Sequence, residues 1–248
     1  MKILQSNFAK TLLFIITCLV ANTIYANDEL HQPFTDVLSE SVNNGQVDYK
    51  AIKNNPKYHS YIKSLETKTD FTNKDEELAY WINAYNALVI QGILNGSSPS
   101  TFFGRMRFFK KNKYQVNDRK ISLYDIEHKI IIPFGEPRIH FAINCASSSC
   151  PKLTNQAYSA SNLDEELTQA AKYFINDTMR NHFDSTTKVA SISKIFRWFK
   201  SDFTNHSGTV EKYIAQYISD KSVAEDISAG NYKTKYLIYD WSLNGTAP

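Results

Sequence analysis

The feature that most constrains the fold is one stretch, residues 75–93, that is apolar on nearly every side when it is drawn as a helix. Large apolar residues recur there at the 3.6-residue period of an α-helix: Leu78, Trp81, Ile82, Tyr85, Leu88, Val89 and Ile93. The opposite side carries alanines and Ile90 instead of charges. A helix without a polar side is buried. We therefore predict a central helix here, capped by Thr72 or Asn73 and ended by Asn95-Gly96.

The rest of the chain mixes short strands and helices without regular alternation. We predict a hairpin over 113–123 that turns at Asn117-Asp118. Further strands are predicted over 138–144, 188–193 and 235–240, and helices over 162–176, 195–203 and 210–218. This irregular order disfavours a parallel βαβ sheet. We expect an α+β fold in which a small, mostly antiparallel sheet packs on the buried central helix, with additional helices around them.

The first 26 residues have the features of a secretory signal peptide. Lys2 and Lys10 give a positive start, the apolar run over 11–21 is too short to span a bilayer, and Ala26 offers a cleavage site. A lipoprotein signal modified at Cys18 and an uncleaved anchor are the alternatives. We expect residues 27–248 to form a single domain with its core over about 45–245. That domain is expected to be periplasmic or secreted after cleavage near Ala26, without a transmembrane span.

The charge balance gives no support for a nucleic-acid partner. The chain has 28 Lys and Arg against 25 Asp and Glu, and two of the lysines lie in the signal segment, which leaves the mature chain close to neutral. Nucleic-acid-binding domains carry a basic patch or stripe. We expect the partner to be an unidentified small molecule, peptide or protein, and no nucleic acid.

Residues with reactive side chains are densest over 138–151. Cys145 is a candidate nucleophile, and His140 is the candidate base that takes its proton. Asn144 or the remote Asp240 is the candidate group that orients the imidazole. On a strand, His140 and Cys145 would point to opposite faces, so they meet only if the strand ends or bends at Asn144.

Cys145 and Cys150 also have a structural interpretation. They are the only cysteines after the signal segment, and two thiols close in sequence in an oxidising compartment usually form a disulfide. Their C-x4-C spacing is not the C-x2-C spacing of thioredoxin-type redox sites. We expect the disulfide, and a free reactive thiol is the alternative.

Further polar residues are candidates for binding or for support of a site. His128 is a second candidate base, with Asp125 three residues before it on the same side of a helical turn. The same pair also fits a solvated turn with an ion pair. Asn83 and Asn86 lie in the central helix, where they either tie loop backbones to it or line a ligand site.

Arg138 and Trp241 complete the candidate binding residues. Arg138 is a candidate ion-pair partner of Asp240, and Trp241 follows that acid directly. The His, Cys and Asp residues of these segments are of the types that bind zinc, but the sequence has no HExxH motif and no paired CxxC motifs. We expect neither a metal site nor a cofactor.

Residues 102–113 are both aromatic and basic. They include Phe102, Phe103, Phe108 and Phe109 together with five Lys and Arg residues. We expect a solvated surface segment whose aromatic side chains turn inward. Contact with anionic lipid or with a peptidoglycan-like polymer is the alternative.

Four motifs in order along the chain resemble the DUF547 family, a domain of unknown function. They are AYWINAYNAL over 79–88, LYDIEH over 123–128, PRIHFAINC followed by SCP over 137–151, and YDWSLN over 239–244. Val47-Asp48-Tyr49 matches the usual entry to the domain. The resemblance implies a domain over about 45–245 and an exported, single-domain bacterial protein, but it implies no activity.

A weaker resemblance in topology is to papain-like and transglutaminase-like folds, which set a buried helix against an antiparallel sheet. It implies catalytic positions for His140 and Asp240. The catalytic cysteine of those folds opens the central helix, where this chain has Tyr80 and Trp81. We therefore expect a ligand- or protein-binding domain with a Cys145–Cys150 disulfide. The alternative is a thiol-dependent enzyme of acyl or amide transfer, or of hydrolysis, that uses Cys145 with a histidine base.

Overall fold

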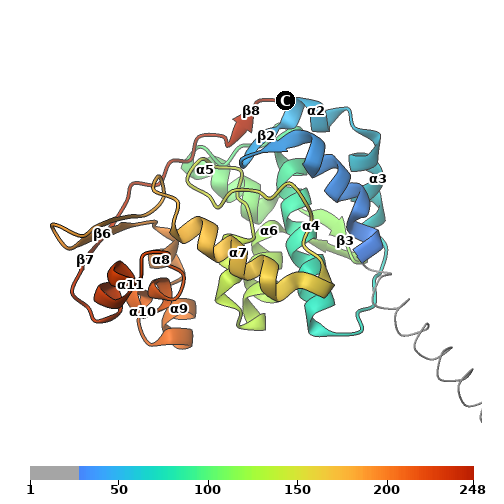
Figure 1. Ribbon diagram of the computed structural model, residues 1–248. Helices are drawn as coiled ribbons and strands as arrows, with labels where there is room; N and C mark the ends of the chain where they lie inside the picture. Colours follow the sequence, from blue (N-terminus) through green and yellow to red (C-terminus); the bar gives the residue numbers. More distant parts are fainter. Residues whose placement is uncertain (1–27) are drawn as a thin grey trace, which may run out of the picture.

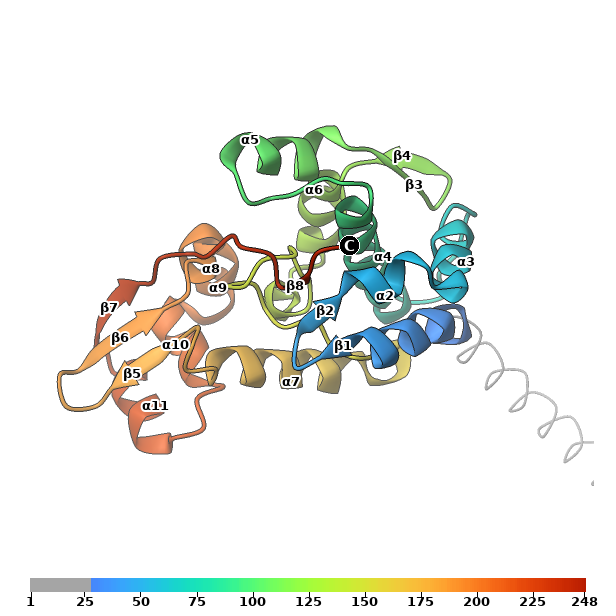
Figure 2. The same ribbon diagram turned by 90° about the horizontal axis from the view of Figure 1, so that it is seen from above.

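A long buried helix lies at the centre of the fold. The computed structural model describes residues 28–248, so the predicted signal peptide lies outside the described residues. The central helix α4 spans Lys74–Leu94, and sixteen of its 21 residues are buried. The side chain of its N-cap, Asn73, accepts a hydrogen bond from the backbone amide of Glu76. Figure 1 and Figure 2 show α4 among the other helices, so the predicted central helix is confirmed.

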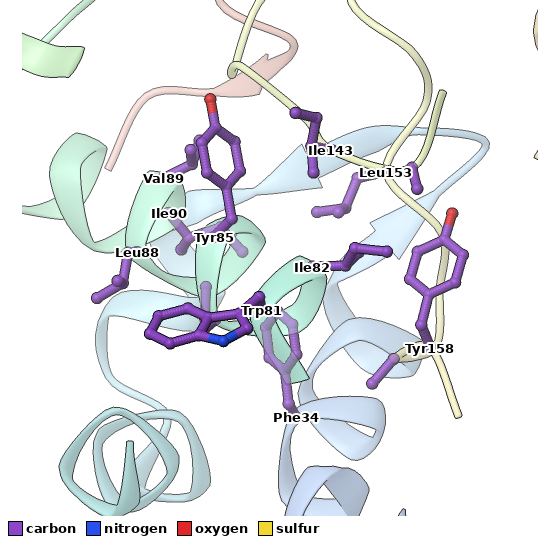
Figure 3. Packing of buried hydrophobic residues seen from close by; sticks show 14 of the residues in the cluster. Phe34, Trp81, Ile82, Tyr85, Leu88, Val89, Ile90, Ile143, Leu153 and Tyr158 are labelled. Carbon is purple, nitrogen blue, oxygen red and sulfur yellow. The ribbon is translucent and has the colours of Figure 1, made fainter. Parts of the chain in front are cut away.

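The side chains of α4 point in several directions and pack against different parts of the chain. Figure 3 shows Ile82 beside Leu153 and Tyr158, whereas Trp81 points to another side of the helix. Trp81 is only 1% exposed. Because burial of large aromatic side chains contributes strongly to stability, α4 organises the larger of the two hydrophobic clusters.

The N-terminal elements cover α4 and bind the C-terminal end of the chain. They are a helix that includes residues 28–41, β1 (Val42–Asn43), β2 (Gln46–Asp48), α2 (Tyr49–Lys53) and α3 (Pro56–Ser64). β1 and β2 pair antiparallel, and β8 (Gly245–Thr246) joins β2 in parallel. A side chain at Gly245 would place its Cβ 1.9 Å from the carbonyl oxygen of Val47, so this close approach requires glycine.

The middle of the chain consists of short helices and one hairpin. The helices are α5 (Phe102–Arg105), the π-helical η1 (Met106–Lys111), α6 (Leu123–Ile126), the π-helical η2 (Glu127–Ile131) and the 3₁₀ turn η3 (Ile132–Phe134). The hairpin pairs β3 (Tyr114–Val116) with β4 (Arg119–Ile121). Its turn residues Asn117 and Asp118 have φ angles of 46° and 55°, as a two-residue hairpin turn requires. The predicted hairpin is confirmed.

The strand predicted over 138–144 is wrong. The chain forms a 3₁₀ helix there, η4 (Pro137–Phe141), in which the side chain of Glu136 accepts a hydrogen bond from the amide of Arg138. Pro137 at the first helical position favours this turn because its φ is already fixed near the helical value. A short apolar run does not distinguish a buried strand from a buried helix.

The last third of the chain forms the second hydrophobic cluster. η5 (Ala160–Asn162) precedes it, and α7 (Leu163–Ile175) contributes Ala171, Phe174 and Ile175 to it. Its sheet is formed by β5 (His182–Asp184), β6 (Val189–Ile192) and β7 (Lys233–Tyr236). β5 and β6 are antiparallel, whereas β6 and β7 are parallel. Its short helices are α8 (Ile195–Trp198), α9 (Lys200–Ser207), α10 (Val210–Ala215) and α11 (Lys221–Ser228). The helix predicted over 195–203 is thus two helices that meet at Phe199, and the last long strand ends at Tyr236.

The fold class is α+β, as predicted, but the strands form three small sheets instead of one. Only some of their pairs are antiparallel. Within residues 28–248, no helix has the length and apolarity needed to cross a bilayer.

Candidate functional site

Two asparagines fix the loop that carries Cys145. The amide of Asn144 donates to Asn86 Oδ1 on α4 at 2.8 Å. The side chain of Asn144 donates to the carbonyl of Pro151 at 2.7 Å and accepts from the amide of Ala146 at 2.8 Å. Ala146 has a φ of 59°, a left-handed value that few non-glycine residues adopt. The loop is therefore held in a defined conformation from both ends.

The C-terminal segment packs along the other side of this loop. Ser147 pairs with Leu243 as an antiparallel bridge, and the amide of Ser148 donates to the carbonyl of Ser242 at 2.8 Å. This pairing brings Tyr239 next to Cys145, although the two residues are 94 positions apart. The YDWSLN motif thus belongs to the same site as the cysteine motif.

The expected disulfide between Cys145 and Cys150 is not formed in the structure. Both cysteines are free, and their sulfur atoms lie 2.7 Å apart, whereas a disulfide bond is about 2.05 Å long. The amide of Cys145 also donates to Cys150 Sγ at 2.8 Å. The two thiols therefore form one hydrogen-bonded pair.

Cys145 is the more acidic thiol of the pair. Burial raises its pKa, but hydrogen bonds from Cys150, Ser147 and Tyr239 outweigh this effect and bring the pKa to about 7. Ser147 Oγ and Tyr239 OH both lie 3.1 Å from Cys145 Sγ. For Cys150, burial and the neighbouring Cys145 thiolate raise the pKa. At neutral pH the negative charge of the pair therefore resides on Cys145.

Cys145 lines a pocket of about 240 Å³ together with both candidate histidines, His128 and His140. Residues from α4, η1, α6, η2, η4, α8 and the C-terminal segment contribute to its walls. Trp198, Tyr239 and Trp241 form an aromatic group on one side, with ring centroids 4.6–5.8 Å apart. The pocket is thus a mostly apolar space with a few ionisable groups, as small-molecule sites commonly are.

His140 is held in one orientation by Asp202 from α9. His140 Nε2 lies 2.7 Å from Asp202 Oδ2, and the imidazole stacks on Phe199 at 3.9 Å between ring centroids. The hydrogen bond from His140 lowers the pKa of Asp202, so the carboxylate accepts and Nε2 carries the proton. The Nδ1 atom is then an unprotonated acceptor, and it is buried without a hydrogen-bond partner among the described residues.

Burial keeps His140 neutral at pH 7. It lowers the pKa of His140 more than the hydrogen bond to Asp202 raises it. His140 thus combines a neutral imidazole with a nitrogen that has no hydrogen-bond partner in residues 28–248, and it shares the pocket with the Cys145 thiol. A base and a thiol are two of the groups that nucleophilic catalysis uses. Asp202 orients the imidazole. It therefore has the role that we predicted for Asn144 or Asp240.

Glu127 adds a second ionisable group to the pocket wall. Tyr85 OH donates to Glu127 Oε2 at 3.3 Å. Burial raises the pKa of Glu127 to about 8, and the charge of Cys145 adds to the rise. Glu127 is thus protonated when Cys145 is ionised, which makes it a proton donor. His128, beside it, stacks on Tyr124 at 4.0 Å, and burial lowers its pKa.

The other predicted binding residues lie in supporting or surface positions, apart from Trp241. Asn83 holds the backbone of Tyr158 through two hydrogen bonds of 2.8 Å. Asn86 holds Ala142 and Asn144 in the same way. Both asparagines therefore tie loop backbones to α4.

Three charged candidates lie away from the pocket. Arg138 pairs with Glu136 and Asp164 instead of Asp240. Asp125 pairs with Lys113 and Lys129 instead of His128. Asp240 is exposed, and its carboxylate accepts a hydrogen bond from the amide of Ser242. It therefore shapes the C-terminal segment and does not contact His140.

Asp202 was not among the predicted site residues, and no role was predicted for Glu127 or Tyr239. Glu127 and Tyr239 lie within the quoted motifs, so the motifs contained a signal for them. Asp202 lies on a short, mostly polar helix outside every motif. Nothing local to that helix marks one aspartate as the partner of a buried histidine.

A larger open groove of about 970 Å³ lies on the far side of Pro151, between the loop that follows it and α7. None of the candidate catalytic residues lines it. Pro151 contributes to both spaces and separates them. The candidate chemistry is therefore confined to the smaller pocket.

Comparison with protein-family models identifies residues 69–175 as a DUF547 region, described as "Protein of unknown function, DUF547". The predicted family resemblance is thus confirmed over these residues, whereas the predicted motifs at 47–49 and 239–244 lie outside the match. The matched residues include α4, Glu127, His140 and both cysteines, whereas Asp202 and Tyr239 lie outside them. The comparisons with curated proteins and with solved structures gave no match.

Proposed function

We propose that the chain is a thiol-dependent enzyme that transfers or hydrolyses an acyl group, with Cys145 as nucleophile. The observation that carries this proposal is the shared pocket of Cys145 and His140. One nitrogen of the histidine is held by Asp202, and the other has no hydrogen-bond partner within residues 28–248. A thiol, a base and a group that orients the base are the parts of a nucleophilic triad.

The first step is attack by the Cys145 thiolate on the carbonyl carbon of an ester or amide. Tyr239 and Ser147 stabilise the thiolate, so a substantial part of the enzyme is ionised at neutral pH. A carbon–sulfur bond forms, and the bond to the leaving alcohol or amine breaks. The leaving group takes a proton from Glu127, whose pKa of about 8 keeps it protonated at this point.

The second step is attack on the resulting thioester by water or by an acceptor alcohol or amine. His140 Nδ1 takes the proton of the attacking group, and Asp202 stabilises the imidazolium that forms. The thiolate leaves, and the proton returns to Glu127. This sequence consumes no oxidant or metal.

A binding domain closed by a Cys145–Cys150 disulfide is the second candidate function. The observation that favours it is the short distance between the two sulfur atoms, 2.7 Å. Oxidation of the pair removes the nucleophile and leaves an aromatic-walled pocket that still admits a ligand. Export under the direction of residues 1–26 is part of both proposals, because an oxidising compartment decides which state of the pair predominates.

A panel of chromogenic esters, thioesters and amides, assayed under reducing conditions, tests the enzymatic function. We expect Cys145→Ala to abolish turnover and to leave the melting temperature within a few degrees of the unchanged chain. Cys150→Ala is the matched control, since it removes the neighbouring sulfur but keeps the nucleophile. Equal turnover of Cys145→Ala and the unchanged chain would contradict the proposal. Resistance of both cysteines to reductant, with lower melting temperatures in both variants, would favour the binding domain.

A further inference from the structure

Several large apolar side chains that are exposed in the described part of the molecule belong to the Cys145 pocket or to the helical segment that leads into it. Among residues 28–248, the exposed large hydrophobic residues are Phe102, Phe103, Met106, Tyr173, Met179, Trp198 and Ile238. Met106 and Trp198 line the pocket itself. Phe102 and Phe103 lie one helical turn before Met106. Tyr173, Met179 and Ile238 belong neither to the pocket lining nor to this segment.

The exposure of these side chains is large. Phe103 is 82% exposed and Ile238 is 91% exposed. Phe108, on the opposite side of the same helical segment, is fully buried against Gly92 of α4. The expectation that the aromatic residues of 102–113 turn inward is therefore wrong for Phe102 and Phe103. One side of the segment anchors it, and the other presents aromatic rings to the outside.

The same segment carries a strong positive charge. Residues 99–117 contain five Lys and Arg residues and no Asp or Glu. Arg107 and Lys111 follow Phe103 at intervals of four residues, which places them on the same side of a helix. Both are exposed, and neither forms an ion pair in the described part of the chain. Lys113, in contrast, is neutralised by Asp125.

Two cations of the segment also form cation–π contacts with aromatic residues that line the pocket. The Arg105 guanidinium lies 4.5 Å from the centroid of Trp241, and Lys110 Nζ lies 4.3 Å from the centroid of Tyr124. These contacts join the basic segment to the aromatic wall across the pocket mouth. The exposed rings and cations of the basic segment therefore lie beside the pocket. We call this surface the rim and define it by Phe102, Phe103, Met106, Arg107, Lys111 and Trp198.

We propose that the rim docks on an anionic lipid bilayer, with the mouth of the Cys145 pocket facing the lipid. Aromatic and aliphatic side chains that enter the headgroup region, flanked by Lys and Arg that contact anionic headgroups, are the elements of peripheral membrane binding. The overall charge of the chain is only +3, so the concentration of cations beside these rings is a local feature. This inference goes beyond the thiol chemistry and does not depend on it.

Vesicle co-sedimentation tests the proposal. Residues 28–248 contain both hydrophobic clusters, so the chain is used from Asn27 onward, without the apolar leader, which would bind lipid by itself. We expect binding to vesicles of equimolar phosphatidylglycerol and phosphatidylcholine, weakening as salt is added, and little binding to phosphatidylcholine alone. No preference for the anionic vesicles would overturn the proposal.

Two double variants locate the surface. Phe102→Ser with Phe103→Ser, and Arg107→Gln with Lys111→Gln, are each expected to weaken vesicle binding by about tenfold or more. Tyr173→Ser with Met179→Ser is the matched control, because these side chains are 75% and 84% exposed but lie outside the rim. An equal loss of binding in the control would overturn the assignment of the rim. All six positions are exposed, so the melting temperature is expected to stay unchanged.

Tryptophan fluorescence gives an independent readout of the same contact. The chain has three tryptophans, of which Trp198 is 46% exposed and Trp81 is buried. We expect a blue shift on addition of anionic vesicles, and loss of most of that shift in Trp198→Phe. A shift that persists unchanged in this variant would contradict the orientation. Cys145 is unchanged in every one of these variants. Failure of lipid binding would therefore not contradict the thiol proposal, and absence of thiol-dependent turnover would not contradict lipid binding.

Discussion

Asp202 and His140 are 62 positions apart in the chain, and their side chains meet at 2.7 Å between Oδ2 and Nε2. This contact connects α9 of the second hydrophobic cluster to η4, which precedes the cysteine loop. It also fixes the tautomer of the imidazole, because a carboxylate only accepts hydrogen bonds. The free nitrogen of His140 is therefore Nδ1.

The first prediction concerns this contact. Asp202→Asn keeps the size of the side chain but removes the charge that stabilises an imidazolium, and the amide favours the wrong tautomer. We expect kcat to fall by about 10²-fold or more, with a smaller change in KM. Steady-state kinetics on an active substrate of the panel measure this. The pH midpoint of Cys145 alkylation is expected to stay nearly the same. Equal kcat in the variant and the unchanged chain would show that Asp202 has no role in the mechanism.

The second prediction concerns the hydroxyl that faces the thiolate. Tyr239→Phe removes one hydrogen bond to Cys145 Sγ and preserves the ring packing against Trp198 and Trp241. The pKa of Cys145 is then expected to rise, since a hydrogen bond to the charged form lowers a pKa. The rate of alkylation by iodoacetamide, followed against pH, measures the shift. Tyr236→Phe is a suitable control, because Tyr236 has no contact with the thiols. A downward shift in Tyr239→Phe is the opposite of what the structure implies.

The third prediction separates the two asparagines of α4. Each is buried and holds backbone groups of a loop through two hydrogen bonds, but Asn86 holds the cysteine loop and Asn83 holds Tyr158. We expect Asn83→Ala and Asn86→Ala each to lower the free energy of unfolding by about 1–3 kcal/mol, measured by urea denaturation. Only Asn86→Ala is expected to change the alkylation rate of Cys145. Similar alkylation in both variants would mean that Asn86 does not position the thiol.

The fourth prediction concerns the pH dependence of stability. Burial lowers the pKa of His31 from 6.5 to about 4, and its Nδ1 lies 2.7 Å from Tyr61 OH. Between these two pH values the unfolded chain binds more protons than the folded chain, so the free energy of unfolding rises with pH. The contribution of His31 is complete above about pH 6.5 and amounts to about 3 kcal/mol.

Urea denaturation of His31→Gln between pH 4 and pH 7 measures that contribution. The variant is expected to show a shallower dependence on pH than the unchanged chain. Some dependence remains, because burial lowers the pKa of His140 as well and acts in the same direction. His59→Gln is the control, since His59 is exposed. A steeper dependence in His31→Gln would show that the sign of the linkage is wrong.

The parts of the fold that were predictable from the sequence are those with a repeated local signal. The all-round apolar pattern over 75–93 and the cap at Asn73 predicted α4 correctly. Asn117-Asp118 predicted the hairpin turn correctly. The segment over 138–144 had no such signal, because its apolar run suits a strand and a helix equally. Pro137 was the available sign of a helical start.

For the candidate site, the sequence indicated the residues near Cys145 but not their partners. The cysteine, His140 and His128 lie in recognisable motifs, and all three line one pocket. Asp202 reaches His140 through packing of α9 against η4, which depends on long-range contacts. Of the two predicted orienting groups, Asn144 holds the cysteine loop instead, and Asp240 lies in a motif but is exposed. The proximity of Asp202 to His140 therefore has no local sequence signature.

The role of Cys145 as a low-pKa nucleophile is best tested by its rate of alkylation in the folded, reduced protein as a function of pH. Intact mass gives the number of thiols labelled, and peptide mapping identifies which one. We expect labelling of Cys145 with a midpoint near pH 7, and protection of Cys150, whose pKa is raised by burial and by the neighbouring thiolate. Preferential labelling of Cys150, or no labelling of Cys145 below about pH 8.5, the usual pKa of a free thiol, would contradict it.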